Sequence, residues 1–411
     1  MIPVVFVAPF FRETTLRFVR AAAELPGVRV GLVSQDPLDR LPAEVRRPLA
    51  AHARVEDALA PGPLLGGIER ITAEIGRPER LLGTLEELQV PLGQLRDRLG
   101  IPGMGAEHAR NFRDKSRMKD VLRAAGLPCA RHALATSVDE AVERAEGIGY
   151  PIVMKPPEGS GARSTVRVDT TDQLRRTLAT AAPSASRPWL LEEFVQGEEC
   201  SFDSIFVDGK LAWWNVNHYE PGPLTVLENG WIQWCVLSPR EVDADRYRDI
   251  REVAERSLHA LGMETGLSHM EWFRRPDGSI AVSEVGARPP GAQFTTLVSF
   301  GADLDLYRAW AKLMVFGTFE SKPRPYAAGA AYLRGQGQGP IRRIHGLEEA
   351  ARELGSLVVE SKLPRVGQIT SGTYEGDGYV ILRHPDTEVV RTSLRNLVST
   401  IRVDAGRMEA R

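Results

Sequence analysis

Two glutamates thirteen residues apart, Glu271 and Glu284, are the side chains of this chain whose spacing most suggests chemistry. Each lies in an alternating apolar and polar run, which is typical of a strand, and an Asp277-Gly278 turn separates the runs. A hairpin would bring both carboxylates to one point. Two such oxygen ligands suit Mg²⁺, which also takes substrate phosphates. Taken alone, the pattern favours an ordinary hairpin with two exposed glutamates.

Two further residues belong to the same segment. Arg288 follows Glu284 by four positions, and a guanidinium can bind a carboxylate or phosphoryl group through two parallel hydrogen bonds. His269 precedes Glu271 by two positions, so it shares the same face of a strand. It could contact a substrate or act as an acid or base, and a core histidine with satisfied hydrogen bonds is an equal alternative.

Lysine is scarce in this chain, which makes its positions informative. Only seven of the 52 basic residues are lysines, and the rest are arginines. Lys155 ends an apolar run that predicts a buried strand, where an ammonium without a partner would be costly. Lys115 lies in a charged helical segment, where a solvated helix face is the simpler interpretation.

A flexible loop follows Lys155, with the sequence Gly159-Ser160-Gly161-Ala162-Arg163-Ser164-Thr165. Small residues let backbone N–H groups close over phosphate oxygens, and the hydroxyls and Arg163 could support them. This is not a Walker A loop, because no Gly-Lys-Ser/Thr follows the glycines. A plain glycine hairpin beside a lysine is the alternative.

An acidic segment follows farther along the chain. Glu192, Glu193, Phe194 and Val195 end an apolar run, and Glu199 comes shortly after them. A sheet edge of this kind could offer backbone groups to adenine and a carboxylate to ribose hydroxyls. The alternative is a crossover between domains with exposed acids.

Bulk composition limits the class of protein. A chain of 411 residues exceeds what one core serves and predicts two or three domains. Hydrophobic content of 43% and charged content of 26% are those of a soluble globular protein, expected in the cytoplasm. A net charge of -2 argues against nucleic acid, and no run is long enough for a transmembrane helix. The three cysteines are widely spaced and form no CxxC pair, so they suggest neither a structural zinc site nor a disulfide framework.

The pattern of predicted elements indicates a mixed α/β protein. A βαβ unit without a GxGxxG fingerprint opens the chain, and a single charged helix is predicted over 106–125. Strands and helices then alternate, and a mainly stranded segment contains one long helix. The ranges are strands 2–8 and 28–33, helix 12–25, mixed elements 129–181, strands within 198–300, helices 243–261 and 303–316, a linker at 322–325, and a small alternating piece 326–411.

Taken in order, these motifs resemble the ATP-grasp superfamily, and within it the carboxylate–amine ligase branch that includes amino-acid ligases. The resemblance covers residues 106–300. Each motif is weak singly, but five in the right order are hard to obtain by chance. They are Asp114-Lys115, Pro151-Ile152-Val153-Met154-Lys155-Pro156, the 159–165 loop, the segment from Glu192 to Glu199, and the set Glu271, Glu284 and Arg288.

The resemblance implies a three-part architecture. Residues 1–105 would form a Rossmann-like pre-ATP-grasp domain, and residues 106–320 the ATP-grasp domain with a lid subdomain at about 128–192. Residues 321–411 would form a small C-terminal α+β subdomain. Cofactors would be ATP and Mg²⁺, with Mn²⁺ as a substitute. Partners would be a small-molecule carboxylate and amine, and a homodimer is an analogy with the family.

The family also implies a role for each matched residue. Lys115 and Lys155 would hold the ATP phosphates, and Ser160, Gly161, Arg163 and Ser164 would cover them. The segment from Glu192 to Val195 would bind adenine, largely through backbone groups, with Glu199 on the ribose side. Glu271 and Glu284 would bind Mg²⁺, and Arg288, Lys155 and His269 would be catalytic.

One position departs from the family pattern. Gly286 stands where the common Glu-x-Asn-x-Arg sequence has a third oxygen ligand. The implied chemistry is activation of a carboxylate as an acyl phosphate, followed by attack of an amine. Two alternatives stay open at this point. One is a biotin-carboxylase-like or purine-pathway enzyme, and the other is a nucleotide-binding regulator without turnover.

Overall fold

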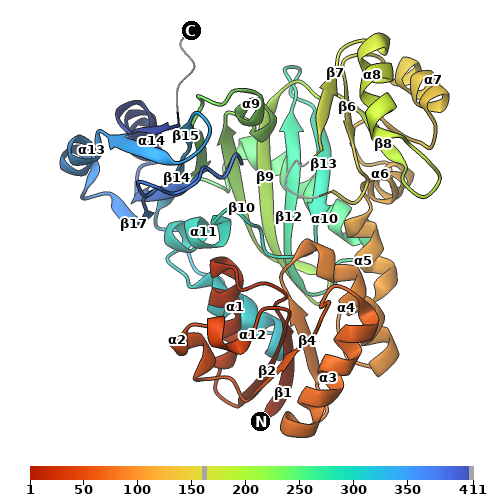
Figure 1. Ribbon diagram of the computed structural model, residues 1–411, viewed down its shortest axis with the longest axis vertical. Helices are drawn as coiled ribbons and strands as arrows, with labels where there is room; N and C mark the ends of the chain where they lie inside the picture. Colours follow the sequence, from red (N-terminus) through yellow and green to blue (C-terminus); the bar gives the residue numbers. More distant parts are fainter. Residues whose placement is uncertain (160–163, 407–411) are drawn as a thin grey trace.

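The computed structural model describes residues 1–159 and 164–406, whose strands form four sheets (Figure 1). Three predicted phosphate-loop residues, Ser160, Gly161 and Arg163, lie outside the described residues. The mixed α/β class that the sequence predicts is confirmed.

The N-terminal segment forms a four-stranded parallel sheet in the order β3-β2-β1-β4. Its two central strands, β1 and β2, are mainly apolar because helices cover both faces of the sheet. One face packs on α1 and also on α12 from far along the chain, through Phe6 and Phe18 against Trp310. The elements are β1 (Ile2–Val7), α1 (Glu13–Ala23), β2 (Val28–Ser34), α2 (Ala43–Arg46), β3 (Ala51–Arg54), α3 (Pro61–Ile75), β4 (Arg80–Gly83), α4 (Gln89–Leu99) and α12 (Leu306–Phe316).

The single helix predicted over 106–125 is wrong. The structure has two helices, α5 (Ala106–Arg113) and α6 (Lys115–Ala124), which meet at Asp114. Asp114 leaves helical geometry, and its carboxylate accepts the backbone N–H groups of Ser116 and Arg117. This is an N-cap, which supplies acceptors to the free donors at the start of a helix. The break places Lys115 on the first turn of α6.

A small antiparallel sheet in the order β5-β8-β6-β7 stands beside the central sheet, with α7 and α8 against it (Figure 1). We call these elements the lid. Side-chain oxygens of Ser137 and Thr170 cap its two helices. The elements are β5 (His132–Ala135), α7 (Val138–Ile148), β6 (Ile152–Lys155), β7 (Val166–Val168), α8 (Thr171–Ala181) and β8 (Trp189–Glu193).

The central sheet has eight antiparallel strands in the order β13-β12-β9-β10-β11-β14-β18-β17. Its last three strands come from the C-terminal part of the chain, so this part extends the central sheet (Figure 1). The elements are β9 (Glu198–Val207), β10 (Lys210–Glu220), α9 (Pro223–Glu228), β11 (Trp234–Ser238), α10 (Arg248–Leu261), β12 (Gly266–Arg274), β13 (Ile280–Gly286), α11 (Phe294–Ala302), β14 (Ala327–Leu333), β17 (Val358–Lys362) and β18 (Gly378–His384).

The C-terminal part also carries a three-stranded sheet in the order β15-β19-β16. Helices α13 and α14 share one hydrophobic cluster with β14 and β18. The elements are β15 (Gly335–Gln336), β16 (Ile341–His345), α13 (Leu347–Leu354), α14 (Thr387–Thr400) and β19 (Arg402–Ala405).

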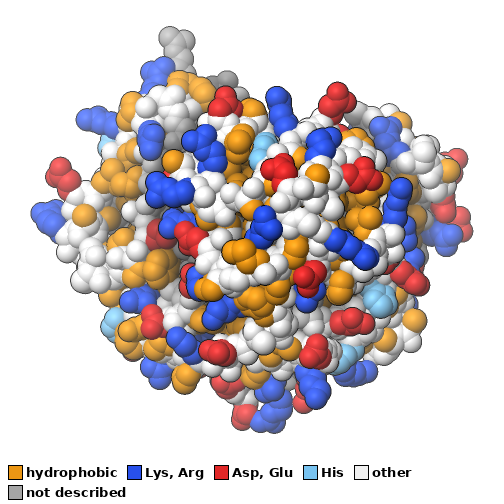
Figure 2. Space-filling model, turned by 90° about the horizontal axis from the view of Figure 1, so that it is seen from below, with side chains coloured by type: hydrophobic (Ala, Val, Ile, Leu, Met, Phe, Trp, Pro, Cys, Tyr) orange, Lys and Arg blue, Asp and Glu red, His pale blue; other side chains and the backbone are white. Residues whose placement is uncertain are grey.

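Charged side chains of both signs are interspersed over the face of the molecule that includes the N-terminal sheet (Figure 2). This distribution agrees with the formal net charge of -2. Within residues 1–159 and 164–406, each helix is too short or too polar to cross a membrane.

Candidate functional site

A cavity of about 770 Å³ brings together residues from the N-terminal segment, the lid and the central sheet. Its wall contains eleven of the residues that the sequence singles out. They are Lys115, Lys155, Glu192, Glu193, Phe194, Val195, Glu199, His269, Glu271, Glu284 and Arg288. Ser164 does not line the cavity, although the neighbouring Thr165 does.

The predicted hairpin exists, and its two glutamates lie directly opposite each other. β12 and β13 pair antiparallel with Glu271 facing Glu284 in register. The register shifts immediately after this pair, so Ser283 is an extra residue on β13. Such a bulge commonly re-aims groups beside a site. Here the Ser283 carbonyl accepts a hydrogen bond of 2.6 Å from Lys119.

The two carboxylates differ in their ionisation. Burial and the nearby Glu284 charge raise the pKa of Glu271. Burial would also raise the pKa of Glu284, but Lys115 and Lys155 lower it. Lys115 lies 2.9 Å from Glu284 and also donates to the carbonyl of Gly159 over 2.6 Å. Opposed carboxylates of this kind repel each other, and a divalent cation between them would remove that repulsion. The donor set therefore fits Mg²⁺.

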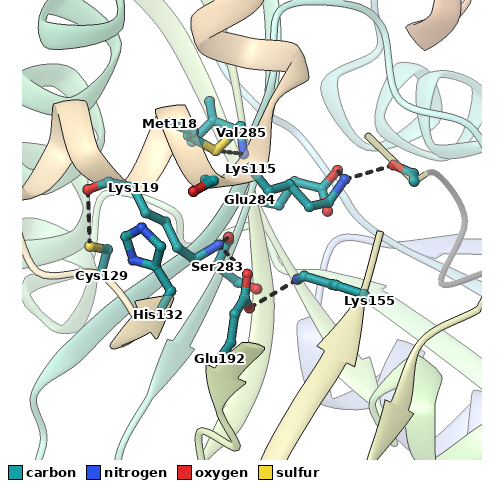
Figure 3. Close-up of polar contacts among 12 residues, drawn as sticks. Lys115, Met118, Lys119, Cys129, His132, Lys155, Glu192, Ser283, Glu284 and Val285 are labelled. Atoms are coloured by element: carbon teal, nitrogen blue, oxygen red, sulfur yellow. Dashed lines mark hydrogen bonds and ion pairs between the residues drawn. The ribbon is translucent and has the colours of Figure 1, made fainter. Parts of the chain in front are cut away.

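Three lysines meet two glutamates beside the hairpin (Figure 3). Lys119 and Lys155 converge on the carboxylate of Glu192, at 2.7 Å and 3.0 Å. The side chains of Lys119 and Glu192 are 0% and 5% exposed, so this pair lies in the interior. Lys155 is 12% exposed and lines the cavity. The cluster therefore turns one lysine towards the cavity and keeps another behind it.

The pKa values in this cluster depend on burial and on the number of lysines that face each glutamate. Burial alone would raise the pKa of Glu192, but Lys119 and Lys155 lower it to about 2. Burial lowers the pKa of Lys119, and the neighbouring Lys155 lowers it further. Burial likewise opposes the charge of Lys155, but Glu192 and Glu284 raise its pKa. Lys155 therefore keeps its positive charge towards the cavity.

The carboxylate of Glu192 forms two ion pairs that the sequence did not predict. The backbone of Glu192 lies within the lid sheet, paired with His132 on one side and Val153 on the other. Its side chain is committed to the two lysines. Glu193 is also engaged, because it pairs with Arg131 over 2.8 Å and with Arg275 in the hairpin turn. The pair with Arg275 holds the lid against the hairpin.

Glu199 enters the same cavity from β9. Burial and the charge of Glu271 raise the pKa of Glu199 to about 8, although Lys155 opposes them. At neutral pH the carboxyl is therefore mainly protonated in the folded protein. A neutral carboxyl can both donate and accept a hydrogen bond, which suits the hydroxyls of a sugar.

We expect Glu199→Gln to raise stability at alkaline pH. The unfolded carboxyl has a pKa near 4.5 and the folded one about 8, so the folded state binds the extra proton between these values. Wild-type stability therefore falls as pH rises through this window. Each pH unit corresponds to about 1.4 kcal/mol. Urea unfolding of both proteins between about pH 4 and pH 9, a range that contains this window, should reveal a difference that grows up to about pH 8. A constant difference would contradict the assignment.

Arg288 is held in place by a residue that the sequence did not single out. Its Nε lies 2.5 Å from Glu86, which follows β4 of the N-terminal sheet, and its Nη1 donates to the Pro289 carbonyl over 2.9 Å. Burial alone would lower the pKa of Arg288, but Glu86 raises it. Arg288 lines the cavity, as do Phe294 and Tyr374.

Gly286 leaves room for this ion pair. A Cβ at residue 286 would lie 3.2 Å from Oε2 of Glu86 and 3.7 Å from the Arg288 side chain. A larger side chain in the position where the family has asparagine would therefore press on Glu86. The departure from the family pattern and the Glu86–Arg288 pair are thus coupled.

If this chain uses the carboxylate substrate and ATP that the family resemblance implies, we expect Gly286→Asn to weaken binding of the carboxylate rather than of ATP. The new side chain would displace Glu86 and turn the Arg288 guanidinium, with an effect of about 10-fold to 100-fold on KM for that substrate. Steady-state kinetics with each substrate varied in turn would separate the two constants. A rise confined to KM for ATP would contradict the coupling.

His269 has a defined orientation. Its Nδ1 lies 2.5 Å from Asp203, and its Nε2 lies 3.9 Å from Glu271. Asp203 accepts a further hydrogen bond of 2.8 Å from Asn217. Burial alone would lower the pKa of His269, but Asp203 raises it. The imidazole is therefore fixed with one nitrogen towards the carboxylate pair.

Several members of the site escape sequence reasoning. Glu86, Lys119, Asp203 and Tyr374 have no motif around them, and aromatic residues such as Tyr219 and Trp234 are more often found in a core than in a pocket. One signal was available for Lys119, because it is one of seven lysines and lies one helical turn after Lys115. Glu86 is recognised as a member of the site only from the tertiary structure, which places the end of β4 against the end of the hairpin.

Comparison with known proteins identifies a domain in this chain. Residues 120–300 match the family model of the ATP-grasp domain. The L-arginine-specific L-amino acid ligase of Bacillus subtilis is 22% identical over 317 residues, which are 76% of each chain. The alanine–anticapsin ligase of Bacillus subtilis (strain 168) is 24% identical over 319 residues, which are 71% of this chain and 64% of that protein.

A solved structure shares the whole fold. The crystal structure of an L-amino acid ligase from Bacillus licheniformis has a TM-score of 0.79 at 18% identity. The match covers 99% of both chains. It extends beyond the ATP-grasp domain to the N-terminal sheet and to the C-terminal strands.

Proposed function

Since residues 120–300 match the ATP-grasp domain and the fold is that of an L-amino acid ligase structure, we propose that this chain is an ATP-dependent carboxylate–amine ligase that forms amide or peptide bonds between small molecules. The observation that carries the proposal is the position of Glu271 and Glu284 opposite each other in a cavity that also holds Lys115, Lys155 and Arg288. These groups serve both halves of such a reaction.

ATP would lie between the lid and the central sheet. Lys155 would hold its phosphates, with Lys115 released from Glu284 as the phosphates arrive. The backbone after Glu192 would face adenine, and Glu199 would face the ribose. Mg²⁺ held by Glu271 and Glu284 would neutralise phosphate charge and align the γ-phosphoryl group. Phosphoryl transfer asks a protein mainly for position and charge neutralisation, which this set supplies.

The carboxylate substrate would bind at Arg288. The guanidinium is pre-oriented by Glu86, so little rotational freedom is lost on binding. Attack of the carboxylate on the γ-phosphoryl group gives an acyl phosphate and ADP. His269 lies beside Glu271 with its pKa raised by Asp203. It would stabilise the negative charge that develops on oxygen when the amine attacks.

The amine substrate would lie against the aromatic wall. Tyr219, Trp234, Phe294 and Tyr374 line the cavity near Arg288, and three of them pack around Trp234 with centroid distances of 4.9 to 6.0 Å. Such a surface suits an apolar or aromatic side chain. The relatives named above are ligases of amino acids, which supports amino acids as the substrate class.

The proposal is tested by a screen for turnover. Pairs of amino acids, and other carboxylates with amines, are incubated with Mg²⁺ and ATP, and the nucleotide products and conjugates are identified. We expect ADP and phosphate in equal amounts with an amide product. Release of AMP and pyrophosphate would overturn the acyl-phosphate route. Absence of any coupled product across the screen would overturn the ligase assignment.

A further inference from the structure

A second cluster of ligating side chains lies in the same sheet. Two of its members, Cys200 and His218, do not line the reaction cavity, whereas Glu198 does. Glu198 and Cys200 lie two residues apart on β9, so they share a face, and His218 lies opposite Cys200 on β10. β9 and β10 lie side by side in the central sheet (Figure 1). Glu199 lies between Glu198 and Cys200 in the sequence, so its side chain points to the opposite face of the sheet, where it lines the cavity. The ligand atoms of the three residues all lie within 4.8 Å of one another.

One nitrogen of His218 is the focus of the cluster. Nδ1 lies 2.5 Å from Glu198 and 3.5 Å from the sulfur of Cys200. A single proton on Nδ1 could serve one of these neighbours but not both. The other nitrogen, Nε2, lies 2.6 Å from the hydroxyl of Tyr247. Histidines that bind metals almost always donate their second ring N–H to a carboxylate, a carbonyl or water, which fixes the tautomer. The hydroxyl oxygen of Tyr247 can accept this N–H in the same way.

We propose that Glu198, Cys200 and His218 bind a Zn²⁺ ion, with Tyr247 orienting the histidine. The ligand set of one thiolate, one imidazole and one carboxylate is typical of zinc, and the thiolate disfavours Mg²⁺ and Ca²⁺. Ideal tetrahedral bonds to zinc separate nitrogen and sulfur by about 3.6 Å. The distance of 3.5 Å between His218 and Cys200 matches this value.

The third ligand has freedom to adjust. An oxygen and a nitrogen bound to one zinc lie about 3.3 Å apart, so the Glu198 carboxylate would withdraw from its 2.5 Å contact with His218. Its side chain is 56% exposed, whereas that of His218 is 9% exposed. The exposed side also gives the ion an entrance from solvent and a position for a water ligand.

The surrounding charges permit a cation at this point. Arg274 faces Glu198 across the β9–β12 pair, but Asp249 binds its guanidinium through contacts of 2.6 and 2.9 Å. Arg246 lies over the ring of Tyr247 at 4.7 Å. Burial and the charge of Glu198 raise the pKa of the Cys200 thiol. Metal binding would therefore release a proton and would strengthen as pH rises.

Cobalt provides the test, because thiolate-bound Co²⁺ absorbs in the near ultraviolet and carboxylate-bound Co²⁺ does not. The purified full-length protein is titrated with Co²⁺ in excess Mg²⁺, which occupies the Glu271–Glu284 pair. We expect a charge-transfer band that saturates at one equivalent and disappears when Zn²⁺ is added. Zn²⁺ should also raise the thermal unfolding temperature.

Variants locate the site. Cys200→Ser should abolish the band. Cys235 is a second buried cysteine, on β11, and Cys235→Ser should leave the band unchanged. Glu198→Gln and His218→Gln should weaken Co²⁺ binding by about 10-fold or more; Glu198→Gln changes a largely exposed side chain and should keep the fold. Absence of the band in the wild type, its persistence in Cys200→Ser, or unchanged affinity in Glu198→Gln would each overturn the proposal. None of these results depends on ligase activity.

Discussion

Glu284→Gln is expected to reduce turnover by about 10³-fold while the protein stays folded. The substitution keeps the size of the side chain but removes the charge that faces Glu271 and pairs with Lys115. Without it the site loses one of the two carboxylates proposed to bind Mg²⁺, and Lys115 loses the anion that positions it. Initial rates of ADP formation would measure the loss.

The matched control lies in the same hairpin. Asp277→Asn changes an exposed carboxylate in the turn, where it accepts hydrogen bonds from Ser279. We expect near-normal rates for this variant. The circular dichroism spectrum of Glu284→Gln should resemble that of the wild type. A Glu284→Gln enzyme with a rate within about 10-fold of the wild type would remove Glu284 from the phosphoryl-transfer site.

Lys119→Met is expected to lower the free energy of unfolding by about 3–5 kcal/mol. Lys119 is fully buried and binds both Glu192, over 2.7 Å, and the Ser283 carbonyl, over 2.6 Å. Its loss leaves a buried acceptor without a donor and a buried carboxylate with one cation instead of two. Urea unfolding would measure the change.

Lys155→Met provides the contrast. The same carboxylate holds Lys155, but this side chain faces the cavity, where water can reach the vacated position. We expect a smaller loss of stability and a large loss of turnover. Lys312→Met, on the exposed side of α12, should change stability by about 0.5 kcal/mol or less. Equal stability of Lys119→Met and wild type would show that the buried cluster does not need its second cation.

The pH dependence of the same cluster has a definite sign. The pKa of Glu192 is about 2 in the folded protein, below its usual 4.5. Its contribution to stability is therefore complete above about pH 4.5 and is lost as pH falls towards 2. Glu199 has the opposite sign, because its pKa is raised. The two glutamates thus limit stability at acid and alkaline pH respectively.

The amino-acid sequence alone determined the chemistry-bearing hairpin and its neighbours. Alternation and an Asp-Gly turn are local signals, so they predicted the opposed Glu271 and Glu284 correctly. The order of the lysine, loop and carboxylate motifs identified the ATP-grasp fold, which is confirmed. The local pattern failed at Asp114, where a single capping side chain outweighs the helical propensity on both sides.

The tertiary structure decided which side chains meet. Glu86 and Arg288 are 202 residues apart in the chain, and their pairing depends on the end of β4 lying against the end of β13. Lys119 meets Glu192 and Ser283 only where α6, the lid and the hairpin converge (Figure 3). Long-range packing brings such pairs together, and burial then makes them strong or costly. The spacing of residues in the sequence predicts neither the pairing nor the burial. Only the tertiary structure therefore distinguishes Lys155, which lines the cavity, from Lys119, which is buried behind it.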